Sequence, residues 1–255
     1  MSHSRVETFK RCPYQFKLRY IDGLKTMFNL EPTNALALGT AMHEGIEKGE
    51  GKAIQSYYSN YPTATEGMVN EAIKLEVMVY KARNTLSDLL RFGQFEVEIH
   101  HPDFVGFIDL LVPIKGKPNV YDIYDFKYSK NVKNYLESSQ LHLYKHFLEQ
   151  TTGVKVRNLA FVFIPKVNLK QEENEDLSEY RKRLVEECEK QEISIVPIEY
   201  DPVKVIDFML NVKHCIECED YDKNPTKLCY WCDYQQYCES NGQLDTTIIY
   251  PKEDE

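Results

Sequence analysis

Two apolar runs at the centre of the chain, 104–112 and 120–128, are rich in Val, Ile, Phe and Tyr. The segment between them, PIKGKPN, carries Pro, Gly and Lys, so the pattern predicts a β-hairpin. Asp109 interrupts the apolar residues of the first strand, and Asp125 and Lys127 lie two residues apart in the second. Because side chains alternate between the two faces of a strand, Asp125 and Lys127 are predicted to share one face.

The hydrophobic pattern on either side of the hairpin predicts further helices and strands. Helical periodicity and capping residues indicate helices over 35–49, 63–92, 134–150 and 202–218. Alternating or continuous apolar residues indicate strands over 94–100, 156–164 and 193–200. The sequence therefore predicts an α/β (α+β) fold whose core runs helix, three strands, helix, strand, with a helical insertion before the first strand.

Composition places the chain among ordinary globular proteins. Its 255 residues are 42% hydrophobic and 28% charged, which suits one elaborated domain, expected over 1–240, followed by a polar tail over 241–255. The net charge of −9 argues against a protein that coats nucleic acid by charge alone. The N-terminal residues lack the apolar run of a secretory signal, and we expect a cytoplasmic protein with no membrane partner.

The two acids of the hairpin indicate a metal site. A carboxylate within an apolar strand costs several kcal/mol unless it is compensated, and two carboxylates on adjacent strands repel each other. A bound divalent cation between Asp109 and Asp125 would remove both penalties. Because carboxylate oxygens are hard ligands, the pattern favours Mg²⁺ or Mn²⁺.

The chain contains seven cysteines, and in a cytoplasmic protein clustered cysteines indicate metal binding. The motif C-x2-C-x5-C that begins at Cys229 supplies three thiolates within ten residues. Cys215 and Cys218 would complete a zinc-ribbon spacing with the first two of these cysteines. Cys12 is the alternative fourth ligand and would join the two ends of the chain. The spacing leaves both arrangements open.

The hairpin motifs resemble those of the PD-(D/E)xK nucleases, with G-x-x-D ending at Asp109 and D-x-K running from Asp125 to Lys127. The early Cys-Pro and the C-terminal cysteine motif resemble the iron–sulfur branch of the RecB-type nucleases, which includes AddB and the CRISPR-associated RecB-like exonucleases. This resemblance implies a restriction-endonuclease-like core and an iron–sulfur subregion formed by 1–20 and 202–240. The [4Fe-4S] ligands that it implies are Cys12, Cys229, Cys232 and Cys238.

The same resemblance implies roles for residues around the hairpin. The helix GTAMHEGIEKG contains the family's metal-binding histidine, and QLHLYKHFLE contains its Q-x3-Y pair. The implied ligands of Mg²⁺ or Mn²⁺ are His43, Asp109, Asp125 and the carbonyl of Phe126. The implied catalytic residues are Asp109, Asp125, Lys127, Gln140 and Tyr144.

These features together predict a metal-dependent DNA nuclease, expected to be a single-strand exonuclease of DNA recombination, repair or processing. DNA with free ends is the expected partner, and because no helicase segment is present, a helicase would be a separate protein. Two alternatives stay open: a catalytically silent DNA-binding or scaffold subunit, and a zinc-ribbon module. The aromatic residues beside the cysteines are expected to shield the cluster rather than to stack on bases; they are Tyr14, Phe16, Tyr230 and Trp231.

Overall fold

The computed structural model describes residues 1–243 and 248–249. The chain divides into two compact units, each assembled from separate segments. The first unit comprises Met1–Asn29, Pro102–Val105 and the C-terminal region from Pro202, and the second comprises Leu30–His101 and Gly106–Asp201. The polar tail expected over 241–255 lies outside the described residues, apart from 241–243 and 248–249.

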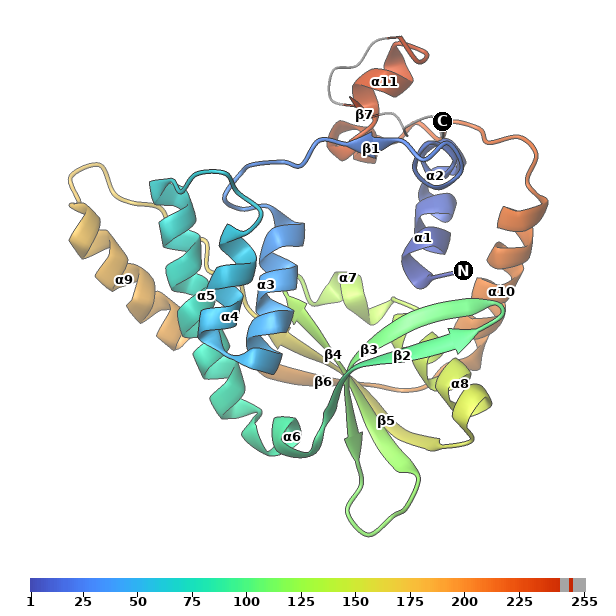
Figure 1. Cartoon of the computed structure of the whole chain (residues 1–255), viewed down its shortest axis with the longest axis horizontal. Helices are drawn as coiled ribbons and strands as arrows, with labels where there is room; N and C mark the ends of the chain where they lie inside the picture. The colour runs from blue at the N-terminus through green and yellow to red at the C-terminus, as the bar shows by residue number, and fades with distance from the viewer. Residues whose placement is uncertain (244–247, 250–255) are drawn as a thin grey trace. The chain divides into compact units, whose positions relative to one another are not determined.

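A five-stranded mixed sheet forms the centre of the second unit (Figure 1). In spatial order its strands are β2 (Gln94–His101), β3 (Phe104–Pro113), β4 (Val120–Tyr128), β5 (Lys155–Ile164) and β6 (Ser194–Ile198). The β3–β4 hairpin is antiparallel, β4 and β5 are parallel, and β6 returns antiparallel to β5. The predicted strands and the predicted mixed α/β fold class are confirmed.

Helices of the second unit precede the sheet or connect its strands. The helices before the sheet are α3 (Ala35–Lys48), α4 (Glu50–Tyr58), α5 (Glu66–Thr85) and α6 (Ser87–Phe92). The connecting helices are α7 (Lys133–Leu136), α8 (Gln140–Thr152) and α9 (Leu177–Lys190). The single helix predicted over 134–150 is therefore wrong in one respect, since three residues separate α7 from α8.

Local chemistry fixes the ends of the helix that carries the predicted histidine. The side-chain oxygen of Asn34 accepts hydrogen bonds from the N–H groups of Leu36 and Ala37, at 2.9 and 3.2 Å, which caps α3. Gly49, with φ of 99°, ends the same helix. Within α3, a Cβ on Gly45 would lie only 2.7 Å from side-chain atoms of Ala53 and Val79. Glycine thus allows α3 to approach α4 and α5 closely.

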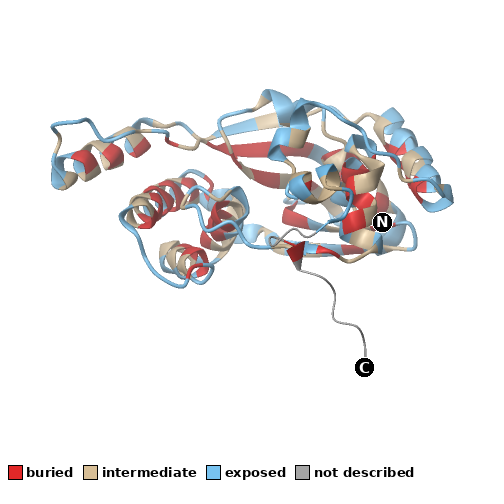
Figure 2. Cartoon of the chain, turned by 90° about the horizontal axis from the view of Figure 1, so that it is seen from above, coloured by how far each residue is buried: buried red, intermediate tan, exposed pale blue. Residues whose placement is uncertain are grey.

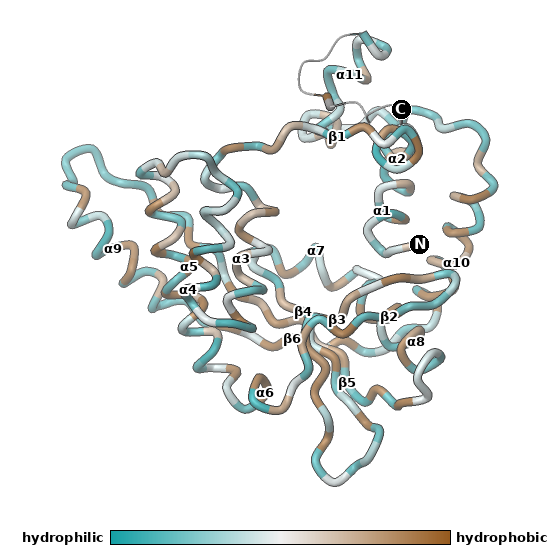
Figure 3. The backbone as a smooth tube through the Cα atoms, in the orientation of Figure 1, coloured by the Kyte–Doolittle hydropathy of each residue, from teal (hydrophilic) through white to brown (hydrophobic). Residues whose placement is uncertain are grey.

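The main hydrophobic core lies between these helices and one face of the sheet. Apolar side chains of α3, α4, α5 and α9 pack with alternate residues of β3, β4 and β5. Buried residues lie along the strands and on the inward sides of the helices (Figure 2). Hydrophobic residues also gather along the sheet strands (Figure 3). Because Phe126 and Tyr128 of β4 face this core, the intervening Lys127 points to the other face.

The first unit joins both ends of the described chain. Its N-terminal elements are α1 (His3–Arg11), α2 (Pro13–Phe16), the π-helical turn η1 (Lys17–Ile21) and β1 (Lys25–Thr26). Its C-terminal elements are α10 (Pro202–Glu217), the 3₁₀ turn η2 (Lys227–Trp231), α11 (Gln235–Glu239) and β7 (Ile248–Ile249). Helix α1 packs on α10, and β1 pairs antiparallel with β7. None of the helices described here is long and apolar enough to cross a membrane.

Candidate active site and cysteine pocket

The acidic site of the second unit begins with a triangle of contacts among β3, β4 and α3. A carboxylate oxygen of Asp109 accepts a 2.7 Å hydrogen bond from the backbone N–H of Phe126, which fixes the carboxylate against the neighbouring strand. Its other oxygen lies 3.4 Å from Nδ1 of His43. The Nε2 atom of His43 lies 3.0 Å from the carbonyl oxygen of Phe126. Three of the four predicted metal ligands therefore contact one another, with Asp109 and the Phe126 carbonyl at different ring nitrogens of His43.

Charge around His43 reflects this geometry. Burial by itself lowers the pKa of the imidazole, but the hydrogen bond and negative charge of Asp109 outweigh it and raise the pKa to about 9. The imidazole of His43 is therefore protonated in the metal-free protein, and its proton occupies the place that a metal ion would take. A divalent cation here must displace that proton.

Asp125 and Lys127 lie on the opposite face of β4 from the main core, as their spacing predicts. The Lys127 Nζ atom is 2.5 Å from a carboxylate oxygen of Asp125, whose side chain is 1% exposed. Burial, followed by the charge of Asp109, raises the pKa of Asp125 to about 7. Neither oxygen of this carboxylate accepts a well-formed hydrogen bond from the described residues. A buried carboxylate in this state fits a metal ligand whose cation would supply the missing compensation.

The amine of Lys127 is held from several sides. Its Nζ donates a 3.0 Å hydrogen bond to the side-chain oxygen of Gln140, whose amide donates to the hydroxyl of Tyr144 at 2.8 Å. The same amine lies 5.4 and 5.5 Å from the ring centroids of Tyr135 and Phe161. Gln140 of the predicted Q-x3-Y pair therefore contacts the lysine, and Tyr144 contacts Gln140. Two aromatic rings that the sequence analysis did not identify complete the surroundings of the amine.

Glu96 of β2 is a further acid at this site that the sequence analysis missed. Ligand atoms of His43, Glu96 and Asp109 all lie within 4.8 Å of one another, close enough for one metal ion. Glu96 is exposed, but partial desolvation, followed by the charge of Asp109, raises the pKa of its carboxyl, as expected for an acid beside another acid. Its backbone φ of 49° is unusual for a non-glycine residue in a strand.

A mixed sheet that carries buried paired acids, a lysine and a histidine offers groups suited to metal-assisted hydrolysis of a phosphodiester. The chain belongs to the PD-(D/E)XK nuclease superfamily, whose family profile matches residues 1–239. The match spans both compact units, including the β3–β4 hairpin and the C-terminal cysteine motif.

Comparisons with individual proteins add little to the family assignment. No curated protein matches the chain. A solved structure described as "Crystal structure of SSO0001" matches over 94% of this chain and 85% of that chain, with 11% sequence identity and a TM-score of 0.39. At this similarity the match carries no argument about function.

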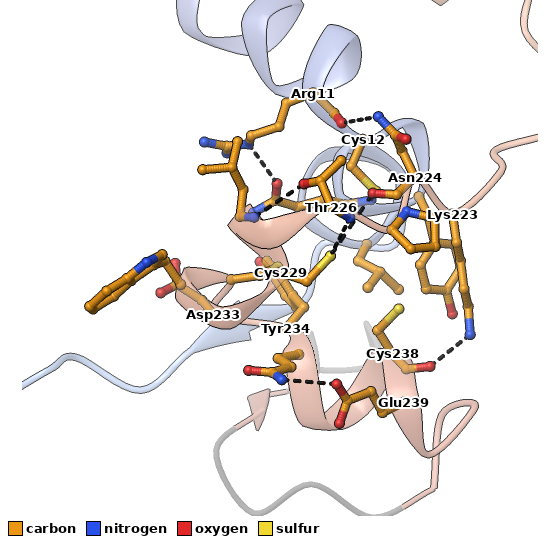
Figure 4. Close-up of a pocket in the computed structure, with 18 of the residues that line it drawn as sticks. Arg11, Cys12, Lys223, Asn224, Thr226, Cys229, Asp233, Tyr234, Cys238 and Glu239 are labelled. Atoms are coloured by element: carbon orange, nitrogen blue, oxygen red, sulfur yellow. Dashed lines mark hydrogen bonds between the residues drawn. The ribbon is translucent and has the colours of Figure 1, made fainter.

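In the first unit, the four cysteines predicted as cluster ligands line one pocket (Figure 4). Burial raises the pKa of the thiols of Cys232 and Cys238, and negative charge at Cys12 and Cys229 adds to the effect at both. The four thiols share one pocket, although no three of their sulfur atoms lie within 4.8 Å of one another. In composition they match the donor set of a four-thiolate centre.

Two of these sulfur atoms already accept backbone hydrogen bonds. The N–H of Gln15 donates to Sγ of Cys12 at 3.5 Å, and the N–H of Thr226 donates to Sγ of Cys229 at 3.4 Å. These bonds tie the two side chains to the local turns at α2 and η2, which orient both sulfur atoms.

The other two cysteines of the zinc-ribbon alternative lie elsewhere in the first unit. Cys215 is buried against Phe9 and Phe16, and Sγ of Cys218 donates to the carbonyl oxygen of Asp220 at 3.1 Å. Neither of these cysteines lines the pocket. The geometry therefore favours Cys12 over Cys215 as a partner of the C-terminal motif.

The aromatic residues around the pocket do not all shield it, contrary to expectation. Phe16 is buried and Tyr14 is half-buried. Tyr230 and Trp231, however, are 73% and 79% exposed, so the shielding prediction is wrong for these two residues. The periodicity of a short 3₁₀ turn gives no reliable indication of which side chains face inward.

Proposed function

We propose that this protein is an Mg²⁺- or Mn²⁺-dependent deoxyribonuclease that acts as an exonuclease on single-stranded DNA during recombination, repair or processing. The observation that carries the proposal is the buried pair of Asp125 and Lys127 beside Asp109 and His43, in a chain of the PD-(D/E)XK superfamily. A catalytically silent scaffold would gain nothing from burying the carboxylate of Asp125 close to that of Asp109. A helicase or another DNA-processing protein is a proposed partner.

The residues present fit a divalent cation. The proposed ligands are His43, Glu96, Asp109, Asp125 and the carbonyl oxygen of Phe126. They combine carboxylate and carbonyl oxygens with one imidazole, a donor set suited to Mg²⁺ and Mn²⁺. When bound, such an ion activates water and neutralises charge on the scissile phosphate.

Lys127 is proposed to position the attacking water or to stabilise the transition state. The ion pair with Asp125 outweighs burial and raises the pKa of the lysine, so the amine is held in its charged form in the metal-free protein. A fixed ammonium group at this point can orient the attacking water and stabilise negative charge on phosphate. Gln140 holds the amine in place, and Tyr144 holds Gln140.

The cysteine pocket is proposed to hold a [4Fe-4S] cluster through Cys12, Cys229, Cys232 and Cys238. Support comes from four neighbouring thiols and two backbone N–H donors to sulfur. Because the ligands come from both ends of the chain, the centre would stabilise the first unit by tying α2 to η2 and α11. Anaerobic purification should yield four iron and four acid-labile sulfide atoms per chain.

A matched pair of variants tests the cluster. Cys238→Ala should abolish iron binding, whereas Cys215→Ala, which lies outside the pocket, should retain it. Protein that holds one zinc ion and no iron would contradict the cluster assignment. Loss of metal in Cys215→Ala but not in Cys12→Ala would instead support the zinc ribbon.

The nuclease proposal is tested by cleavage of end-labelled single- and double-stranded DNA with Mg²⁺ or Mn²⁺. Lys127→Ala should reduce the cleavage rate by about 10²- to 10³-fold, the usual effect of removing one electrostatic contact from a preorganised site. Lys130→Ala is the control, because Lys130 follows the same strand but is exposed. Equal cleavage rates for the two variants would refute the role of Lys127. In the wild-type protein, the end label that is released first gives the polarity of cleavage.

A further inference from the structure

Two neighbouring aromatic side chains project from η2 into solvent. Tyr230 and Trp231 are 73% and 79% exposed, and their rings meet edge to face with centroids 5.0 Å apart. Large aromatic rings usually bury most of their surface, so an exposed pair beside a pocket indicates a binding function.

The turn that carries the two rings is well ordered by its own contacts. The hydroxyl of Thr226 accepts a 3.2 Å hydrogen bond from the N–H of Leu228, and its carbonyl accepts one from Cys229 at 3.0 Å. The N–H of Cys232 in turn donates to the carbonyl of Cys229 at 3.0 Å. The rings therefore lie between two pocket cysteines on a fixed backbone, and little conformational entropy would be lost when a ligand binds them.

The surroundings of the turn are more basic than the chain as a whole. Four basic side chains line the pocket, whereas only two acidic side chains do so, although the chain carries a net charge of −9. The basic residues are Arg11, Arg19, Lys223 and Lys227, and the acidic ones are Asp233 and Glu239. Of the basic residues, Arg11, Arg19 and Lys227 form no ion pair with any other residue in the described part of the chain. Figure 4 shows Arg11 and Lys223 at the edge of the pocket.

We propose that Tyr230 and Trp231 form a stacking platform for the unpaired bases of single-stranded DNA, with Arg11 and Lys227 contacting the phosphates. Exposed rings next to unpaired cations match the alternation of bases and phosphates in a single strand. Paired bases offer no free face to the rings, so duplex DNA should bind less well. The choice of DNA as the ligand rests on the proposed nuclease function.

Binding can be measured without cleavage in an Asp109→Asn background, with EDTA present and a fluorescently labelled oligo-dT strand. In this background Trp231→Ala should weaken the affinity by about tenfold, the loss expected for one stacked base. Trp231→Phe should retain most of the affinity, because it keeps an aromatic face. Tyr80→Ala, which removes a 62% exposed ring of the second unit, is the matched control and should bind as the parent does.

Two further readouts separate stacking from a loss of structure. Trp231 is the only tryptophan in the chain, so saturable quenching of its fluorescence by oligo-dT would report contact at this residue alone. Lys227→Gln should reduce the slope of log K against log salt concentration by about 0.7, the value for one phosphate contact with a single strand. Iron content and circular dichroism should be unchanged in both variants.

The outcomes for the platform and for the nuclease are independent. Unchanged affinity of Trp231→Ala, or quenching by lipid vesicles but not by oligo-dT, would overturn the platform whether or not the wild-type protein cleaves DNA. Binding that depends on Trp231, in a wild-type protein that cleaves neither DNA strand form, would keep the platform and overturn the nuclease.

Discussion

At the scale of single residues, the site depends on carboxylates whose negative charge is not fully balanced by the positive groups around them. Asp109 is held by a backbone N–H, but Asp125 is buried with only the ammonium group of Lys127 beside it. Two cationic groups, the Lys127 ammonium and the protonated ring of His43, face the three carboxylates of Asp109, Asp125 and Glu96. The site therefore retains an excess of negative charge that favours a divalent cation over a monovalent one.

Glu96 provides the first test of this interpretation. Glu96→Gln should raise the Mg²⁺ concentration needed for half-maximal cleavage by at least about tenfold, the smallest loss typical of residues that support a metal site. Glu98→Gln is the control, since Glu98 is an exposed acid of the same strand that lies outside the ligand group. Titration of Mn²⁺ by electron paramagnetic resonance measures the affinity directly. Equal affinities for the two variants would remove Glu96 from the ligand set.

Proton binding gives a second prediction. The pKa of His43 is raised to about 9 from 6.5, so its stabilising contribution is complete below pH 6.5 and disappears as the pH rises through 9. The pKa of Asp125 is raised to about 7 from 3.8, so ionisation of this buried carboxylate also reduces stability as the pH rises from about 4 to 7. Stability of the metal-free protein should therefore fall with rising pH over both intervals.

Metal binding should show the opposite dependence, because the ion displaces these protons. We expect the Tm with Mg²⁺ to exceed the Tm with EDTA by a larger margin at pH 8.5 than at pH 6. Differential scanning calorimetry at both values measures it. His43→Asn should make the Mg²⁺-induced increase in Tm less dependent on pH between pH 7 and 8.5. An increase in Tm that does not change with pH would contradict the assignment of His43 and Asp125 as ligands.

At the scale of secondary structure, the break between α7 and α8 shapes the surroundings of the lysine. Helix α7 brings the ring of Tyr135 against Phe161 and Phe163, with centroids 6.1 and 5.7 Å apart, and against the Lys127 amine. Helix α8 then begins at Gln140, the hydrogen-bond partner of the same amine. A continuous helix would not allow both contacts at these spacings.

Tyr135 tests the role of this break. Tyr135→Leu should lower the cleavage rate by about 5- to 30-fold, because a desolvated cation–π contact contributes about 1–2 kcal/mol. Tyr135→Phe keeps the ring and should retain most of the activity. If both variants lose activity equally, the hydroxyl rather than the ring face is needed, and the proposed contact is wrong. The pH profile of kcat separates a displaced lysine from a loss of folding.

Which parts of this arrangement could be predicted depends on the kind of signal that the sequence carries. The β3–β4 hairpin consists of two runs rich in β-branched and aromatic residues, joined by a turn with Pro and Gly, and its bounds follow closely from the pattern. The break after α7 has neither residue, because it consists of Glu137, Ser138 and Ser139. Glu96 and Glu98 look alike in an alternating strand, and only the folded backbone distinguishes them.

The cysteines show a similar limit. The spacing of C-x2-C-x5-C indicates a metal site, but a fourth ligand distant in sequence is fixed only by tertiary structure. The described fold brings Cys12 into the pocket through α2 and leaves Cys215 packed on α1 and α2. The resemblance to a known family, rather than the spacing, favoured Cys12, which lines the pocket.

At the scale of the whole molecule, the two proposed centres belong to different compact units. The cysteine pocket lies in the first unit and the acidic site in the second, and a bound group stabilises the structure to which it binds. We therefore expect two calorimetric transitions. Loss of the cluster through Cys238→Ala should lower the Tm of one transition, whereas Mg²⁺ should raise the Tm of the other.

Two variants are the matched controls for this experiment. Cys215→Ala should keep both transitions, with only a small decrease in Tm from lost packing. Asp109→Asn should remove the response to Mg²⁺. Limited proteolysis of the Cys238→Ala variant should cut first within the first unit, because local unfolding exposes the backbone there. A single transition that Cys238→Ala and Mg²⁺ shift together would show that the two units unfold as one. In that case the cluster would contribute to the stability of the acidic site as well as to that of its own unit.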